Sequence, residues 1–131
     1  MPIVERAQTT DIPELVKLLS ILFEQEVEFI PDTDAQQRGL SQIIQNPSLG
    51  AILVLREGVA IQGMVNLLFT ISTALGDRVA LLEDMVISPG IRRKGVGSLL
   101  LEQALAFAHS EGCKRITLLT DRDNFPAHRF Y

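Results

Sequence analysis

The sequence contains few cysteine and histidine residues, which cross-link a fold through disulfide bonds or metal ions. Its 131 residues include one cysteine, Cys113, which excludes an intramolecular disulfide framework and a cysteine-based zinc site. Cys113 follows a glycine that we expect to end a helix, and we interpret it as a small buried residue. The two histidines, His109 and His128, have no metal-ligand spacing to each other or to carboxylates, so we predict no metal site and expect both at the surface.

A basic surplus and a hydrophobic leader are missing as well. Twelve Lys and Arg against sixteen Asp and Glu give a net charge of −4, which disfavours a nucleic-acid binder. No basic segment precedes an apolar one at the start, so nothing indicates secretion and we expect a cytoplasmic protein. Repeats, low-complexity tracts and linkers are also lacking, and we predict a single domain over residues 1–131.

Charge is absent from Gly58 to Gly76, a stretch about as long as a membrane span. Apolar residues take its odd positions from Val59 to Ile71, while polar residues take even ones. This alternation is typical of a half-buried strand, and a lipid-facing helix would not need it. We therefore predict a long strand in a sheet and no membrane partner.

Periodicity and turn residues along the rest of the chain predict an α/β (α+β) fold with a central sheet. Asp11 followed by Glu14 indicates a capping box at the start of the first helix. Further strands are expected over residues 3–7, 50–56, 79–88 and 115–120, and helices over about 11–29, over 34–45, from Val96 until Gly112, and from about Asn124.

The segment from Ser88 to Ser98 (SPGIRRKGVGS) joins a predicted strand to a predicted helix. Gly95 and Gly97 remove side chains where the first free N–H groups of that helix point outward. Those N–H groups and the positive helix end form an anion site suited to a phosphate. Local positive charge comes from Arg92, Arg93 and Lys94.

Two known phosphate motifs fit this loop poorly. Gly90 and Gly95 have the Walker spacing, but Val96 stands where that motif requires lysine. Leu100 occupies the third glycine position of the dinucleotide fingerprint, which also lies late in the chain.

The spacing Arg92-x-x-Gly95-x-Gly97 resembles the Q/R-x-x-G-x-G/A pattern of the GNAT superfamily of N-acetyltransferases. Residues 81–102 look like the core strand, turn and helix of that family. The run from Thr120 to Asn124, with Ala127 and Phe130-Tyr131, is similar to its later strand and N-x-x-A-x-x-x-Y helix. The resemblance covers nearly the whole chain and implies a mixed, mostly antiparallel sheet flanked by helices.

GNAT domains usually continue after the tyrosine helix with two more strands, whereas this sequence stops at Tyr131. Either the sequence is a truncated form, or a neighbour supplies the missing strands, or they are dispensable. A bare sheet edge favours association, which makes a homodimer one expected outcome.

The resemblance implies acetyl-CoA as cosubstrate and an amine as acceptor. Pyrophosphate is expected on the loop and helix start, and pantetheine is expected to pair like an extra strand with residues 85–87. An amide near Met85 or Val86 would polarise the thioester carbonyl. Tyr131 matches the tyrosine that protonates the leaving thiolate. The cofactor-binding residues implied are Met85, Val86, Ile87, Arg92, Arg93, Lys94, Gly95, Val96, Gly97, Ser98 and Asn124.

An amine must lose a proton before it attacks, which calls for a carboxylate or a water chain. Glu83 and Asp84 precede the expected pantetheine strand and are expected on opposite sheet faces. Glu83 is our candidate for the base or water orienter, with a buried structural carboxylate as the alternative. A non-catalytic acyl-CoA-binding or sensing domain, or a purely structural dimer module, remain alternative functions.

An acidic stretch suggests a cationic acceptor, with a merely solvated helix edge as the alternative. Between Leu18 and Gln37 the only charged residues are five carboxylates, Glu24, Glu26, Glu28, Asp32 and Asp34.

Overall fold

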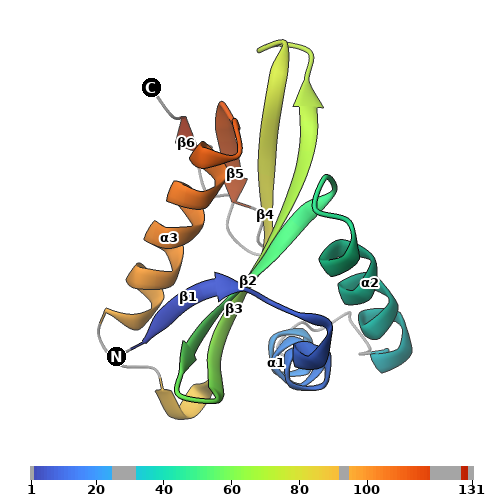
Figure 1. Cartoon of the computed structure of the whole chain (residues 1–131), viewed down its shortest axis with the longest axis vertical. Helices are drawn as coiled ribbons and strands as arrows, with labels where there is room; N and C mark the ends of the chain where they lie inside the picture. The colour runs from blue at the N-terminus through green and yellow to red at the C-terminus, as the bar shows by residue number, and fades with distance from the viewer. Residues whose placement is uncertain (1, 25–31, 92–94, 119–127, 130–131) are drawn as a thin grey trace.

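The computed structural model describes residues 2–24, 32–91, 95–118 and 128–129. Six strands form one sheet in the order of the chain (Figure 1). They are β1 (Ile3–Arg6), β2 (Gly50–Glu57), β3 (Ala60–Ser72), β4 (Asp77–Ile87), β5 (Arg115–Leu118) and β6 (His128–Arg129). Only the β4–β5 pair among these strands is parallel. The expected mixed, mostly antiparallel sheet is therefore confirmed.

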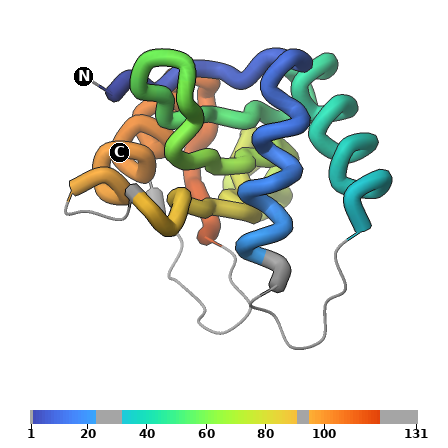
Figure 2. Tube along the Cα trace, turned by 90° about the horizontal axis from the view of Figure 1, so that it is seen from below, coloured from blue at the N-terminus to red at the C-terminus, as the bar shows by residue number. Residues whose placement is uncertain are grey.

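Helices cover both faces of the sheet (Figure 2). The helices α1 (Ile12–Glu24) and α2 (Thr33–Gln45) lie on one face, and α3 (Val96–Ser110) lies on the other. Two short 3-10 turns, η1 (Thr9–Asp11) and η2 (Pro89–Ile91), precede α1 and α3. No helix among the described residues is long and apolar enough to cross a membrane.

Alternate residues of β2 supply both cores. Leu53 and Leu55 pack under α3, whereas Ile52 and Val54 pack under α1 and α2. Because β3 lies between β2 and β4 under the same two layers, its residues from Ile61 to Leu67 are all buried. The prediction of a long strand is confirmed, but the prediction that it is half-buried is wrong, since the alternation cannot reveal a second covering layer.

The start of α1 differs from the predicted capping box. Asp11 belongs to η1, where its carboxylate accepts a hydrogen bond from the Gln8 N–H at 2.8 Å. Asp11 therefore ties the turn backward to Gln8 and forms no box with Glu14. The second helix, α2, begins within one residue of its predicted start at residue 34. Asp32 caps it, because its carboxylate accepts a hydrogen bond from the Ala35 N–H at 3.1 Å.

The C-terminal prediction is partly outside the described residues. The segment 119–127, where a helix is expected to begin, is not described. His128 and Arg129 form β6, which pairs antiparallel with Ile116 and Arg115 of β5. For these two residues the helix prediction is wrong, because hydrogen bonding to β5 holds their backbone extended.

The turn after α3 matches its prediction. Gly112 has a φ of +86°, a left-handed conformation that glycine adopts without a steric penalty. Cys113 behind it is 1% exposed, and burial raises the pKa of its thiol. This is the small buried residue that was expected.

Candidate active site

A β-bulge interrupts β4 at the residues that the sequence singles out. Asn66 of β3 pairs with Asp84, and the next residue, Leu67, pairs with Leu82. Glu83 is the extra residue that this register skips, and its side chain is exposed. Exposure excludes the alternative that Glu83 is a buried structural carboxylate. Glu83 and Asp84 were expected on opposite faces of the sheet because side chains alternate along a regular strand. The bulge interrupts that alternation at Glu83.

The described part of β5 lies beside β4 only before the bulge. The parallel ladder between them covers only Ala80–Leu82 against Ile116–Leu118, whereas β4 stays paired with β3 as far as Ile87. Within the described residues, the edge of β4 after the bulge therefore has no neighbouring strand on the β5 side. Such an edge can accept an extended ligand through main-chain hydrogen bonds.

The main-chain direction of residues 85–87 follows from one hydrogen bond. The Ser88 N–H donates to the Gln62 carbonyl of β3 at 2.8 Å. Because successive residues of a strand turn their N–H and C=O groups to opposite sides, Val86 faces β3, whereas Met85 and Ile87 face the β5 side. The Val86 side chain is buried under α1 and α2. Of the two amides considered as oxyanion donors, only that of Met85 points to the open edge.

The start of α3 presents free N–H groups beside open space. Gly95 is the N-cap, with a φ of 93°, and its carbonyl accepts the first helical hydrogen bond from the Leu99 N–H at 2.9 Å. The N–H groups of Val96, Gly97 and Ser98 precede that bond and have no acceptor inside the helix. A Cβ built on Gly97 meets no described atom within 4 Å. Val96 differs from its neighbours because its side chain is in the α3 core, so only its N–H can serve a ligand.

The two features are consecutive in the chain. β4 leads through η2 and the segment 92–94 into α3, so a ligand extended along Met85 and Ile87 can run toward the α3 N-terminus. Five predicted site residues lie outside the described residues, namely Arg92, Arg93, Lys94, Asn124 and Tyr131. Within the described residues, no group of three or more His, Cys, Asp and Glu side chains could hold a metal ion.

A polar pair beside the bulge was missed by the sequence analysis. The Asn66 amide Nδ2 donates to Asp84 Oδ2 at 3.4 Å. Asn66 is only 6% exposed, whereas the alternation of β3 assigned its even positions to solvent. The sequence places this amide and this carboxylate in two predicted strands. Only the register between the strands shows that the two side chains are opposite each other.

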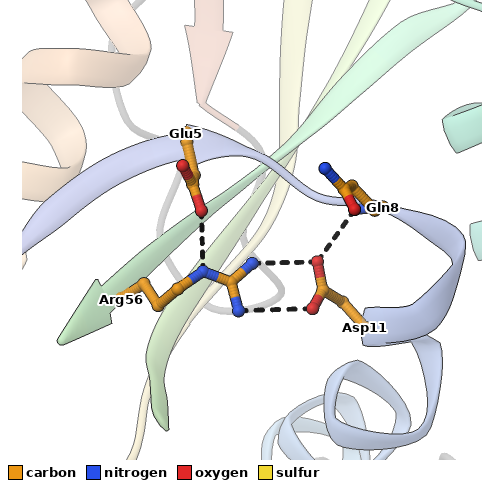
Figure 3. Close-up of polar contacts among 4 residues, drawn as sticks. All are labelled: Glu5, Gln8, Asp11 and Arg56. Carbon is orange, nitrogen blue, oxygen red and sulfur yellow. Dashed lines mark hydrogen bonds and ion pairs between the residues drawn. The ribbon is translucent and has the colours of Figure 1, made fainter. Parts of the chain in front are cut away.

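A second polar cluster holds the N-terminal segment on the sheet (Figure 3). Arg56 of β2 donates through Nε to Glu5 of β1 at 2.7 Å and through a terminal nitrogen to Asp11 at 2.9 Å. Burial opposes the charge on Asp11, but the hydrogen bonds from Arg56 and the Gln8 N–H outweigh it and lower the pKa of the Asp11 carboxyl. The Asp11 hydrogen bonds in turn raise the pKa of Arg56. This cluster fixes η1, and with it the start of α1, against the edge of the sheet.

Comparison with known proteins agrees with this geometry. The model of the acetyltransferase (GNAT) family matches residues 13–131. The chain belongs to the GNAT family. It is therefore an acyltransferase, and the family uses acetyl-CoA as cosubstrate.

Two relatives are similar over most of their lengths. The chain is 29% identical to an uncharacterized N-acetyltransferase of Bacillus subtilis (strain 168), YhfO, covering 98% of this chain and 85% of the relative. It is 27% identical to the aminoalkylphosphonate N-acetyltransferase of Salmonella typhimurium (strain LT2), covering 100% of this chain and 83% of that enzyme.

A solved structure shows the same fold. A possible acetyltransferase from Clostridium difficile 630 superposes with a TM-score of 0.84 at 14% identity, over 95% of this chain and 83% of that one. At this identity the likeness concerns the GNAT fold alone.

Proposed function

We propose that this GNAT protein transfers the acetyl group of acetyl-CoA to a primary amine by direct attack within a ternary complex. The observation that carries the proposal is that Met85, directly after the bulge, turns its main-chain N–H away from β3, on the strand that leads through η2 to the N-terminus of α3. A strand edge followed by a helix N-terminus matches a cosubstrate that is extended at one end and anionic at the other.

Binding would use main-chain groups at both ends. Met85 and Ile87 would pair with the pantetheine amides, and the Met85 N–H would polarise the thioester carbonyl. The N–H groups of Val96, Gly97 and Ser98 would receive the pyrophosphate. Arg92, Arg93 and Lys94 would add positive charge there, and Asn124 would contact the cosubstrate.

The reaction requires three proton transfers, two from the nitrogen and one to the sulfur. Glu83, exposed at the bulge, would take a proton from the ammonium group directly or through water. The amine lone pair then attacks the thioester carbon, and the C–S bond breaks when the tetrahedral intermediate collapses. Tyr131 would give its phenolic proton to the departing thiolate, and the nitrogen would release its second proton to water or back to the Tyr131 phenolate, which leaves a neutral amide and free CoA.

The acceptor is proposed to be a small, cationic amine. The acidic stretch around α1 and α2 supports the charge, since Asp32 and Asp34 stand exposed at the start of α2. The Salmonella relative acts on aminoalkylphosphonates by name, which supports small amines as a class. The acidic stretch favours an acceptor with a net positive charge, whereas an aminoalkylphosphonate also carries a negative phosphonate group. The test therefore includes acceptors of both kinds.

The deciding experiment measures thiol release from acetyl-CoA with four amines: 2-aminoethylphosphonate, ethanolamine, spermidine and lysine. Turnover with any of them supports the proposal. Calorimetric binding of acetyl-CoA without turnover would instead support the non-catalytic acyl-CoA-binding domain, and absence of binding would support a purely structural module.

We also propose that two copies associate through the free end of the β3–β4 hairpin, which extends past β2 (Figure 1). Ile71 and Leu75 are 67% and 39% exposed there, and Leu49 beside them is 50% exposed. Uncharged strand edges of this kind pair readily with another copy. Sedimentation should show a concentration-dependent dimer that Ile71→Lys reduces; an unchanged monomer in both proteins would contradict it.

A further inference from the structure

Asn66 is a buried amide of whose two polar atoms one has a hydrogen-bond partner. Its Nδ2 donates to Asp84, while its carbonyl oxygen Oδ1 is buried and has no partner in the structure described. An unsatisfied buried carbonyl costs about 1–3 kcal/mol, whereas an apolar side chain of similar shape would avoid that cost. Its neighbours Ile52, directly opposite on β2, and Met64 on the same face are apolar, whereas its cross-strand partner Asp84 is charged. The bond to Asp84 accounts for Nδ2, but neither that bond nor the apolar packing accounts for the unpartnered Oδ1.

The location of the pair points to the reaction. Met64 and Val86 form the neighbouring cross-strand pair, and both belong to the core under α1 and α2. Side chains two residues apart on a strand share a face, so Asn66 and Asp84 also lie on the α1 and α2 side. Asp84 directly precedes Met85, whose main chain faces the open edge. The pair therefore stands beside the expected position of the thioester, on the face that carries the acidic helices.

We propose that Asn66 positions the acceptor amine and selects primary amines over N-methylated ones. This inference rests on the proposed acetyl transfer. The Nδ2 donor orients the Asp84 carboxylate, and Oδ1 accepts one N–H of the amine while Asp84 accepts another. Two oxygen acceptors then fix the nitrogen beside the acetyl group. A neutral N-methyl amine has one N–H fewer and leaves one acceptor unpaired, which is the kind of loss that gives strong discrimination.

The test compares Asn66→Leu with Gln62→Leu. Gln62 is a matched control, because it is 8% exposed, lies on the same strand and also has a buried unpartnered carbonyl. It is four residues away, about 13 Å along an extended strand. Acceptors are the best amine of the four above and its N-methyl derivative.

For Asn66→Leu we expect the KM for the primary amine to rise at least tenfold, and the preference over the N-methyl amine to fall by a similar factor. The affinity for acetyl-CoA should stay within twofold of wild type, and the thermal midpoint should not fall. Gln62→Leu should leave both amine parameters unchanged. An unchanged KM and preference in Asn66→Leu, or equal effects in both variants, would overturn the inference.

A measurement on the wild-type protein separates this inference from the proposed function. The side-chain amide resonances of Asn66 are followed by NMR while each of the four amines is added in the presence of CoA. A saturable shift of Asn66, with Gln62 unmoved, supports the amine site even where no turnover is seen, in which case only the proposed transfer fails. No shift with any of the four amines overturns the inference independently of turnover.

Discussion

Asp11 is a residue whose charge the fold uses directly. Its side chain is 12% exposed, and it bonds to both Arg56 and the Gln8 N–H. Because its pKa is lowered in the folded state, the carboxylate contributes stability above its unfolded pKa of about 3.9. That contribution is lost as the pH falls through the lower folded value.

We predict that Asp11→Asn lowers the free energy of unfolding by about 2 kcal/mol at pH 7, the scale of hydrogen bonds to a charged group. The difference from wild type should shrink from about pH 5 downward and vanish below the folded pKa. Urea unfolding at pH 7 and pH 3 measures it. Glu102→Gln on the exposed side of α3 is the control and should match wild type at both values. A pH-independent difference would contradict the role of the Asp11 charge.

Single residues also show where sequence analysis stops. Glu83 could be selected because a carboxylate before an apolar strand is unusual whatever the register. Asn66 could not, because its alternation with apolar neighbours looks the same in a half-buried strand and in one covered on both faces. The bulge that separates Glu83 from the ladder depends on β3 and β4 together, and no local pattern in either strand encodes it.

The strands β2 and β3 approach each other closely at Gly50, so the sheet requires a glycine at this position. A Cβ on Gly50 would lie 2.1 Å from the Leu67 carbonyl oxygen, and the atoms next nearest also belong to the β3 backbone. We predict that Gly50→Ala destabilises the protein by at least about 2 kcal/mol, because no side-chain rotation can relieve the clash. Gly39 in α2 has open space, so Gly39→Ala should stabilise by about 0.5–1 kcal/mol. Denaturant unfolding measures both variants. If both midpoints lie above that of wild type, or both lie below it, this account is wrong.

The α3 terminus supplies a second test at the scale of elements. Gly95 has a positive φ, so its replacement would strain the backbone, whereas Gly97 can be replaced without a clash. We predict that Gly97→Val folds normally and binds acetyl-CoA at least tenfold more weakly, because the side chain keeps phosphates from the N–H groups. Calorimetry measures the affinity, with Gly39→Val as the matched control. Wild-type affinity in folded Gly97→Val would remove α3 from the binding site.

Among the elements, those with strong local signals could be predicted well. The span of α3 follows from its glycines and apolar stripe, and Gly112 ends it as expected. The strand β6 could not be predicted, because His128 and Arg129 become extended only by pairing with β5. The parallel pairing of β4 with β5 is likewise a property of two strands far apart in the chain.

Charge distribution supplies a prediction at the scale of the whole molecule. The five carboxylates between Leu18 and Gln37 give −5 against a total of −4, so the remainder of the chain has +1. If this field attracts the acceptor, kcat/KM for spermidine should fall several-fold between 0.05 and 0.5 M salt, the range over which screening becomes short. The rate with 2-aminoethylphosphonate should change less. Equal salt responses would show that the acidic stretch is only a solvated surface.

The sheet divides the molecule into two compartments with separate packing. Among the described residues, the core under α3 and the core under α1 and α2 share no side chain, and alternate residues of β2 serve one or the other. Substitutions on the α1 and α2 side, where we propose that the acceptor binds, can therefore accumulate in α1, α2 and the residues of β2 and β3 that face them while the α3 side keeps its packing. A library confined to those positions would explore new amine acceptors without rebuilding the cosubstrate site, and natural divergence of acceptor preference could follow the same route.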